Sequence, residues 1–326
     1  MRPRIYLTQP VARSAIERLE KFAELTLNDD PLHIVTKDEL LKAAREHDII
    51  FCLLHDKIDA DIININPTLK AIASMTITPA DIDTKAATAR RLPVTVIPAL
   101  LLNDATADLA FSLLLATARR VAEGDRVMRS GIFPGSQSNY VEGGTVSRKT
   151  LGLVGMGGVG TAMARRALGF SMRVIYHDPR RLTPDQEREL GATWVSFDQV
   201  FRDADFVSVH VQLTPQTRHL IGARQFASMK PTAYFINSAR GPLVDELALV
   251  AALKERRIAG AGLDVYEHEP CPYPDLLKMN NVVCTPHMGS ATRELREAMA
   301  NVVVDNIVAV LEGKQAPNCW NTDIYK

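Results

Sequence analysis

Three glycines in the middle of the chain constrain the fold more than any other feature of the sequence. Residues 150–160 read Thr-Leu-Gly-Leu-Val-Gly-Met-Gly-Gly-Val-Gly, so an apolar stretch typical of a buried strand runs into Gly155, Gly157 and Gly160. In a strand–turn–helix unit, the first glycine allows the tight turn and the second lets backbone approach a pyrophosphate. The third lets the helix pack on the strand. This spacing predicts a nucleotide-binding edge of a parallel sheet.

The residues that follow strengthen this interpretation. An apolar helical stretch runs from Thr161 to Gly169, and a second strand ends at Asp178. A helix N-terminus offers unpaired N–H groups to phosphates, and an acid at this distance accepts hydrogen bonds from the adenosine ribose. Asp178 would bind a free 2′-hydroxyl and repel a 2′-phosphate. We therefore expect NAD as the cofactor, while the nearby Arg180 and Arg181 keep NADP as the alternative.

Size and composition exclude several classes of function. A chain of 326 residues is long enough for two domains. Its formal net charge is zero, from 38 basic and 38 acidic residues, which argues against nucleic acid and membrane surfaces as partners. The four cysteines lack the C-x-x-C spacing of a zinc site, so we expect free thiols and no metal. The N-terminus lacks the apolar core of a signal peptide, and this favours a cytoplasmic location.

The remaining sequence alternates between strand-like and helix-like segments, which predicts parallel sheets covered by helices. Before the glycine motif, strands are expected at Arg4–Leu7, Asp48–Leu53, Leu69–Ser74 and Val94–Ile97, and helices at Pro10–Phe22 and Lys37–Glu46. After it, strands are expected at Trp194–Val195, Phe206–Val211, Ala233–Ser238, Gly260–Val265 and Val282–Thr285, followed by a helix at Thr292–Glu312. The class is therefore α/β, with two doubly wound parallel-sheet domains.

The glycine motif lies mid-chain, so one domain precedes it, and the last helix extends beyond the final strand and can return to that first domain. We expect a substrate domain at 1–98 plus 290–326 and a dinucleotide-binding domain at 99–289. Between the two lies a helix over residues 104–121 that is apolar nearly all round, as in helices buried on several sides. Its small residues favour a subunit interface and hence a homodimer. The alternative is a core helix within one domain.

Three segments after the glycine motif place reactive side chains directly after apolar strands. Arg240 follows Phe-Ile-Asn-Ser-Ala, His287 follows Val-Val-Cys-Thr-Pro, and both Glu267 and Glu269 lie in Asp-Val-Tyr-Glu-His-Glu-Pro. Taken singly, the arginine could form a surface ion pair and the histidine could be structural. Because parallel strands end at one edge of a sheet, we expect the three kinds of side chain to converge there. Such a set binds an anionic carbonyl compound and donates a proton.

In this order, the motifs of the chain resemble the D-isomer-specific 2-hydroxyacid dehydrogenases, especially the glyoxylate/hydroxypyruvate reductase-like members. The matching segments are Gly-Met-Gly-Gly-Val-Gly, Tyr-His-Asp-Pro, Val-Ser-Val-His-Val-Gln-Leu-Thr-Pro-Gln-Thr, Asn-Ser-Ala-Arg-Gly, Asp-Val-Tyr-Glu-His-Glu-Pro and Thr-Pro-His-Met-Gly-Ser-Ala-Thr. The resemblance implies a Rossmann-type NAD-binding domain inserted in a flavodoxin-like substrate domain. It also implies NAD-dependent reduction of a small 2-keto acid, resembling glyoxylate, hydroxypyruvate or pyruvate, to the D-2-hydroxy acid.

The resemblance also assigns roles to individual residues. Arg240 would orient the keto acid, His287 would give its proton to the carbonyl oxygen, and Glu269 would hydrogen-bond His287. A carboxylate beside an imidazolium favours the charged form, so the donor would stay protonated near neutral pH. Glu267 is the competing carboxylate, but it does not match the family position. The cofactor would contact Gly155, Gly157, Gly158, Val159, Gly160, Asp178, Val211, Gln212, Thr217, Ser238, Ala239 and Asp264.

The first domain departs from the family pattern where the substrate carboxylate is normally bound. Family members read Ser-x-Gly-x-Asp there, and this chain places Thr78 at the glycine and Ala80 at the acid, within Thr76-Ile77-Thr78-Pro79-Ala80. The N–H groups of Thr76, Ile77 and Thr78 are the expected donors to the substrate. A dehydrogenase for an atypical acid is therefore an alternative. An NAD-sensing binding protein, similar to the corepressors that share this fold, is another, and turnover on 2-keto acids separates it from an enzyme.

Overall fold

The computed structural model describes residues 2–79 and 81–326, and the chain divides into two compact units. One unit joins Met1–Leu101 to Ala291–Lys326, and the other is Leu102–Ser290. The chain thus leaves the first unit once and returns to it through the last helix. Ala80, the residue at the family's acid position, lies outside the described residues.

The first unit contains a parallel sheet of five strands within its described residues, in the order β2-β1-β3-β4-β5. This is the strand order of flavodoxin-like folds. The strands are β1 (Arg4–Leu7), β2 (Glu24–Leu27), β3 (Ile49–Cys52), β4 (Ala71–Ser74) and β5 (Val94–Thr95). The helices are α1 (Arg13–Glu20), α2 (Lys37–Glu46), α3 (Ala60–Asn64), α4 (Thr84–Ala89) and α12 (Arg293–Leu311), with a 3₁₀ turn at Thr322–Tyr325.

Local signals explain where several of these helices begin. Thr36 and Glu39 form a reciprocal capping box at the start of α2, and Thr292 accepts a hydrogen bond from the backbone at the start of α12. Side-chain caps of this kind satisfy N–H groups that a helix leaves unpaired. Helix α12 packs on α1, where Arg18 forms a 2.6 Å ion pair with Asp305. The last helix therefore belongs to the first unit.

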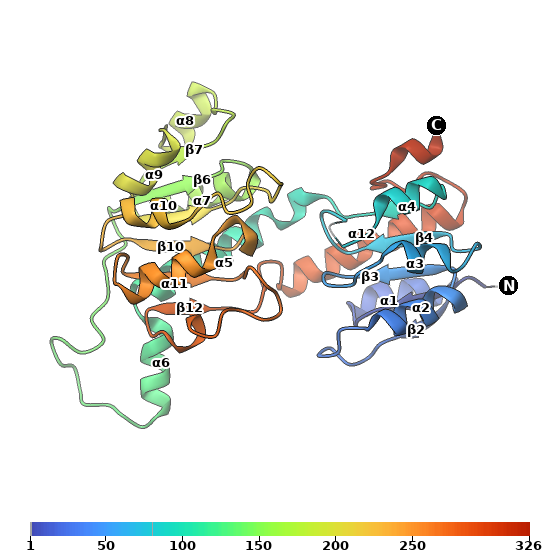
Figure 1. Ribbon diagram of the computed structural model, residues 1–326, viewed down its shortest axis with the longest axis horizontal. Helices are drawn as coiled ribbons and strands as arrows, with labels where there is room; N and C mark the ends of the chain where they lie inside the picture. Colours follow the sequence, from blue (N-terminus) through green and yellow to red (C-terminus); the bar gives the residue numbers. More distant parts are fainter. Residues whose placement is uncertain (1, 80) are drawn as a thin grey trace. The chain divides into compact units, whose positions relative to one another are not determined.

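The second unit, whose residues are all described, contains a seven-stranded parallel sheet in the order β12-β11-β10-β9-β6-β7-β8 (Figure 1). Its strands are β6 (Thr150–Val154), β7 (Arg173–His177), β8 (Ala192–Trp194), β9 (Phe206–Val209), β10 (Tyr234–Asn237), β11 (Gly260–Leu263) and β12 (Val282–Cys284). The order reverses between β6 and β9, which is the Rossmann arrangement. The predicted fold class, a Rossmann-type domain together with a flavodoxin-like one, is confirmed.

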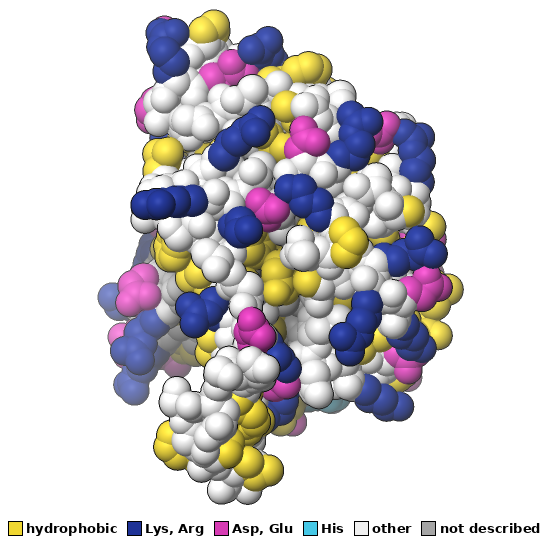
Figure 2. Space-filling model, turned by 90° about the vertical axis from the view of Figure 1, so that its left-hand side faces the viewer, with side chains coloured by type: hydrophobic (Ala, Val, Ile, Leu, Met, Phe, Trp, Pro, Cys, Tyr) yellow, Lys and Arg dark blue, Asp and Glu magenta, His cyan; other side chains and the backbone are white. Residues whose placement is uncertain are grey.

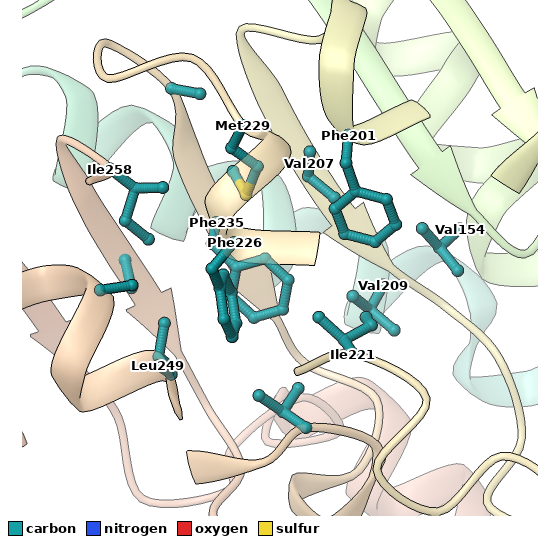
Figure 3. Close-up of a cluster of buried hydrophobic side chains, with 14 of the residues drawn as sticks. Val154, Phe201, Val207, Val209, Ile221, Phe226, Met229, Phe235, Leu249 and Ile258 are labelled. Carbon is teal, nitrogen blue, oxygen red and sulfur yellow. The ribbon is translucent and has the colours of Figure 1, made fainter. Parts of the chain in front are cut away.

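Helices cover both faces of this second sheet. They are α5 (Asn103–Ala118), α7 (Gly158–Gly169), α8 (Pro184–Leu190), α9 (Phe197–Asp203), α10 (Ala223–Ser228) and α11 (Glu246–Lys254), with 3₁₀ turns at Ala99–Leu102, Gly241–Leu243 and Leu276–Lys278. Helix α6 (Val121–Arg129) has no buried residue and projects away from the sheet (Figure 1). Successive side chains along a strand point to opposite faces of the sheet and pack into different hydrophobic clusters. Phe235 packs with Phe226 and Leu249 from the helices on one face (Figure 3), whereas Ile236 packs with α5 on the other.

One face of helix α5 lies in this core. Together with the preceding turn it forms a stretch, 99–118, that is long and apolar enough to cross a membrane, and it is alone in this among the described residues. Ala107, Leu113 and Leu114 are buried in the hydrophobic cluster that also contains Ile236, and α5 packs against α7, β10 and β11. These contacts cover one face of α5, and only 28% of the apolar window in this stretch is buried.

Candidate active site

The glycine turn after β6 has the geometry that its spacing predicts. Gly155 has a φ of +96°, a value that L residues with side chains rarely adopt. A Cβ at Gly160 would lie 2.2 Å from the carbonyl oxygen of Gly155, so only glycine lets α7 pack this close to the turn. A Cβ at Gly157 would meet nothing within 4 Å, which leaves the backbone accessible to a ligand. These residues fit a dinucleotide whose pyrophosphate lies at the start of α7.

Asp178, at the end of β7, is tied to the same turn. Its carboxylate accepts hydrogen bonds from the backbone N–H of Met156 (2.9 Å) and of Arg180 (2.9 Å). Of the two nearby arginines, Arg181 is engaged by Glu187 (2.9 Å). Asp178 therefore holds its carboxylate beside the glycine turn, as an acid that binds ribose hydroxyls would.

The other expected cofactor residues lie after strands β9 and β10. Val211 and Gln212 are in the segment after β9, where the Thr217 hydroxyl donates to the carbonyl of Gln212 at 2.7 Å. Ser238 and Ala239 directly follow β10, and the buried hydroxyl of Ser238 finds no hydrogen-bond partner among the described residues. Buried polar groups are usually satisfied. An unpaired hydroxyl at the edge of a nucleotide-binding sheet therefore fits a ligand.

His287 and Glu269 meet after strands β12 and β11. The imidazole Nδ1 lies 2.7 Å from Oε2 of Glu269, and Oε1 of the same carboxylate accepts from the backbone N–H of Tyr266 at 3.0 Å. Both side chains are mostly buried, with 24% and 17% of their surface exposed. A carboxylate at Nδ1 fixes the orientation of the ring and leaves Nε2 as the nitrogen that can exchange a proton with a ligand.

The turn that carries His287 is held by Asp264. The Asp264 carboxylate is fully buried and accepts from the Thr285 hydroxyl (2.6 Å) and from the backbone N–H groups of Met288 (2.8 Å) and Gly289 (2.9 Å). Burial raises the pKa of this carboxyl group, while these hydrogen bonds oppose the shift. Asp264 thus orders the turn on which His287 lies.

Arg240 lies near the same pair. Arg240 is half-buried, and its guanidinium donates to the carbonyl of Ala239 at 2.7 Å. Burial lowers the pKa of Arg240, and the charge of Glu269 opposes that shift. A partly buried guanidinium with few protein partners can form bidentate hydrogen bonds with a carboxylate, or donate to a carbonyl oxygen.

Glu267, the competing carboxylate, belongs to a different cluster. Its side chain accepts hydrogen bonds from His219, from Arg218 (3.3 Å) and from the backbone N–H of Glu246 (3.3 Å). The structure thus brings together Arg240, Glu269 and His287 and leaves Glu267 with its own partners.

The expected substrate loop lies in the first unit, after β4, and is described here by itself. The Thr76 hydroxyl donates to the carbonyl of Thr78 at 2.8 Å and lies 2.6 Å from the hydroxyl of Ser74. Thr78 is absent from the described residues that have a positive φ, so the loop avoids the backbone shape that the family's glycine permits. Ile77 is half-buried between the two threonines.

Two residues near these sites escaped the sequence analysis. Asn103, at the start of α5, lies against Gly158, where an added Cβ would come within 2.3 Å of its amide nitrogen. Glu246, at the start of α11, bonds the loop that carries Glu269. Neither belongs to a motif with a recognisable spacing, and only the tertiary structure brings them to the site.

Known proteins similar to this chain agree with the geometry. Residues 111–289 match the family model described as "D-isomer specific 2-hydroxyacid dehydrogenase, NAD binding domain". A glyoxylate reductase of Thermococcus litoralis is 44% identical over 99% of this chain and 98% of its own length. A structure from Thermus thermophilus superimposes with a TM-score of 0.90 at 40% identity, covering 97% of this chain and 99% of the other.

A further solved structure shows a relative with its cofactor. It is an NADPH-dependent glyoxylate/hydroxypyruvate reductase from Sinorhizobium meliloti, in complex with NADP and malonate, 31% identical with a TM-score of 0.79 over 99% of this chain and 98% of the other. The chain carries an NAD-binding domain of this family. It belongs to the D-isomer specific 2-hydroxyacid dehydrogenase family and is an oxidoreductase that acts on 2-hydroxy acids.

Proposed function

We propose that the protein is an NAD-dependent D-2-hydroxyacid dehydrogenase that reduces a small 2-keto acid of the glyoxylate, hydroxypyruvate or pyruvate kind. The observation that supports this most is the 2.7 Å contact between Nδ1 of His287 and Glu269, with half-buried Arg240 close enough to be affected by the charge of Glu269. Relatives named glyoxylate reductase over nearly the full length of the chain support the substrate class.

Each of these side chains has a definite task in that reaction. Arg240 binds the carboxylate or carbonyl oxygen of the keto acid and draws electron density from the carbonyl carbon. When bound, reduced nicotinamide supplies the hydride. His287 holds a proton at Nε2 and passes it to the carbonyl oxygen as negative charge develops there. Glu269 keeps the imidazole oriented through its contact with Nδ1.

NAD rather than NADP is the cofactor in this proposal. Asp178 holds its carboxylate next to the glycine turn, where it repels the 2′-phosphate of NADP. Arg181, which could otherwise bind that phosphate, is paired with Glu187 and lies over the ring of Trp194. Arg180 is exposed, and its backbone N–H is bonded to Asp178.

A panel of 2-keto acids tests the proposal. Initial rates with NADH and with NADPH are measured on glyoxylate, hydroxypyruvate, pyruvate and a bulky 2-keto acid. We expect turnover of the small acids with NADH, and D-configured products from hydroxypyruvate and pyruvate. Glycolate, the product from glyoxylate, has no stereocentre, so the configuration of the product is measured only with hydroxypyruvate and pyruvate. Failure to turn over any small acid, or an L-configured product, contradicts the proposal.

An atypical acid is a second candidate because of the loop at Thr76–Pro79. The hydroxyls of Ser74 and Thr76 close this loop on itself, and Thr78 replaces the family's glycine. A substrate that needs room or different donors at this loop would appear in the same panel as a preference for the bulky acid. We retain the small acids as the first choice, since they agree with the names of the full-length relatives.

We also propose that the protein forms a homodimer through the region around the 104–121 helix. One face of α5 is covered by its own unit, and the exposed apolar residues follow it: Val121 (58% exposed), Met128 (55%), Ile132 (56%) and Phe133 (72%). Hydrophobic side chains show on the segment that projects at the bottom of Figure 2, where α6 and its loop lie, whereas basic and acidic side chains are interspersed over the rest of that face. Exposed apolar groups of this kind mark association surfaces. A monomer in sedimentation velocity contradicts this part of the proposal.

A further inference from the structure

The loop that carries Glu269 has no regular secondary structure to hold it. It runs over residues 264–273, between β11 and the 3₁₀ turn at Leu276–Lys278. A contact of 2.7 Å between Glu269 and His287 nevertheless depends on where this loop lies. Misplacement of a reacting group by about 1 Å costs on the order of 100-fold in rate. Some other part of the unit has to fix the loop.

Glu246 bonds the loop on both sides of Glu269. Its Oε2 accepts from the backbone N–H of Glu267 at 2.8 Å, and its Oε1 accepts from the backbone N–H of Tyr273 at 2.8 Å. A carboxylate is an acceptor only, so each oxygen suits one of these N–H donors. One side chain thus fixes two points of the loop, six residues apart, with Glu269 between them.

Glu246 is itself well anchored. It is the first residue of α11, which Asp245 caps by accepting from the backbone N–H of Ala248 at 3.0 Å. The negative charge lies at a helix N-terminus, where it is stabilised. Glu246 is 8% exposed, and Leu249 and Leu253 from the same helix are buried in the core. The loop is therefore bonded to an element that cannot shift without disturbing that core.

The same loop also supports Arg240. A Cβ at Gly241, the residue after Arg240, would lie 1.8 Å from the carbonyl oxygen of Tyr266 and 2.5 Å from the backbone nitrogen of Glu267. The backbone next to Arg240 therefore rests directly on the part of the loop that Glu246 bonds. The position of this loop affects two of the three side chains of the proposed catalytic set.

We propose that Glu246 is a positioning residue for the reaction, holding the 267–273 loop so that Glu269 meets His287 and Arg240 keeps its place. The inference rests on the proposed function, because it assigns Glu246 a role through Glu269. Glu246 itself does not touch the substrate or the cofactor in this account.

The test is Glu246→Gln. The amide keeps the shape of the side chain but turns one acceptor into an N–H₂ donor, which faces a backbone N–H and loses that hydrogen bond. We expect kcat for keto-acid reduction to fall about 10- to 100-fold. The Kd of NADH should stay unchanged, since the glycine turn is untouched.

Further variants make the result specific. Glu255→Gln, at the exposed residue that follows α11, removes a carboxylate whose ion-pair partner among the described residues is Arg257, and it should behave as wild type. In the pair Glu246→Gln and Glu269→Gln, the double variant should be slowed by less than the product of the two single effects, because part of the Glu246 effect acts through Glu269 and the rest through Arg240. Glu246→Asp keeps both acceptor oxygens and should recover part of the kcat that Glu246→Gln loses, and it replaces Glu246→Gln in the test if that variant does not fold.

The outcomes separate this inference from the function on which it rests. A wild-type kcat in folded Glu246→Gln overturns the positioning role, as does a double variant slowed by the product of the two single effects. If folded Glu269→Gln and His287→Gln both keep wild-type turnover, the catalytic assignment itself is wrong.

Discussion

Replacing Gly160 by alanine tests the dinucleotide turn most sharply. The added Cβ would lie 2.2 Å from the carbonyl oxygen of Gly155 and 3.1 Å from its carbon. An ordinary carbon–oxygen contact is about 3.5 Å, so α7 has to move away from the turn by about 1 Å. Overpacking of this kind costs about 1–3 kcal/mol. At about 2–4 °C per kcal/mol for a unit of this size, Tm should fall by about 2–12 °C.

The displacement should also weaken NADH binding, because the N–H groups at the start of α7 no longer face the pyrophosphate. We expect the Kd of NADH to rise about 10- to 100-fold, measured by quenching of protein fluorescence or by calorimetry, alongside Tm by differential scanning calorimetry.

Two other glycines of the same segment serve as controls. Gly157→Ala meets no protein atom within 4 Å, so Tm should change little while NADH binding is lost to a clash with the ligand. Gly169→Ala, at the far end of α7, also meets nothing and should leave NADH binding unchanged, with stability equal or slightly higher. The reasoning would be refuted if Gly160→Ala bound NADH as tightly as wild type, or if all three variants lost the same amount of NADH affinity.

Three more predictions concern the pH dependence of stability, the substrate clamp and the choice of cofactor. Burial lowers the pKa of His210 to about 3 in the folded protein. Between about pH 6.5 and 3 the unfolded chain therefore binds more protons than the folded protein, and the free energy of unfolding falls as the pH falls. In His210→Gln the urea midpoint should depend less on pH over that window. In Arg240→Lys, kcat should fall about 100-fold and KM should rise, since a point charge cannot replace the guanidinium fork, and unchanged steady-state constants would argue against the clamp. In Asp178→Asn the ratio of kcat/KM with NADH to kcat/KM with NADPH should fall about 10-fold or more. An unchanged ratio would contradict the role of Asp178 in cofactor choice.

Much of the fold could be predicted because its signals are local. Helix α2 has the bounds expected from the sequence, Lys37–Glu46, and the apolar stretches at β1 and β3 gave the positions of these strands. Strand β2 (Glu24–Leu27) was missed, because its residues are only half-buried or exposed at the edge of the sheet and leave no continuous apolar stretch. The strand expected at Val94–Ile97 ends at Thr95, where Val96 bonds instead to the carbonyl of Asn318, a partner more than 200 residues away.

The residues of the candidate site likewise divide into those that the sequence could place and those that it could not. Gly155, Gly160 and Asp178 could be placed from spacing alone, because the strand, turn and helix between them are contiguous. The choice of Glu269 over Glu267 needed a family resemblance at the sequence level and a distance at the structural level, since both carboxylates lie in one loop. Glu246 could not be found from the sequence, because its two partners are backbone N–H groups, which every residue type except proline supplies.

The most direct test of the central claim is the rate of hydride transfer in His287→Gln, compared with wild type at saturating NADH and keto acid. The amide of glutamine occupies similar space but cannot deliver a proton from an imidazolium. With the Kd of NADH unchanged, we predict a fall in kcat of about 100- to 10,000-fold, the contribution typical of a positioned general acid. A folded variant that binds NADH and turns over the keto acid at the wild-type rate would contradict the account.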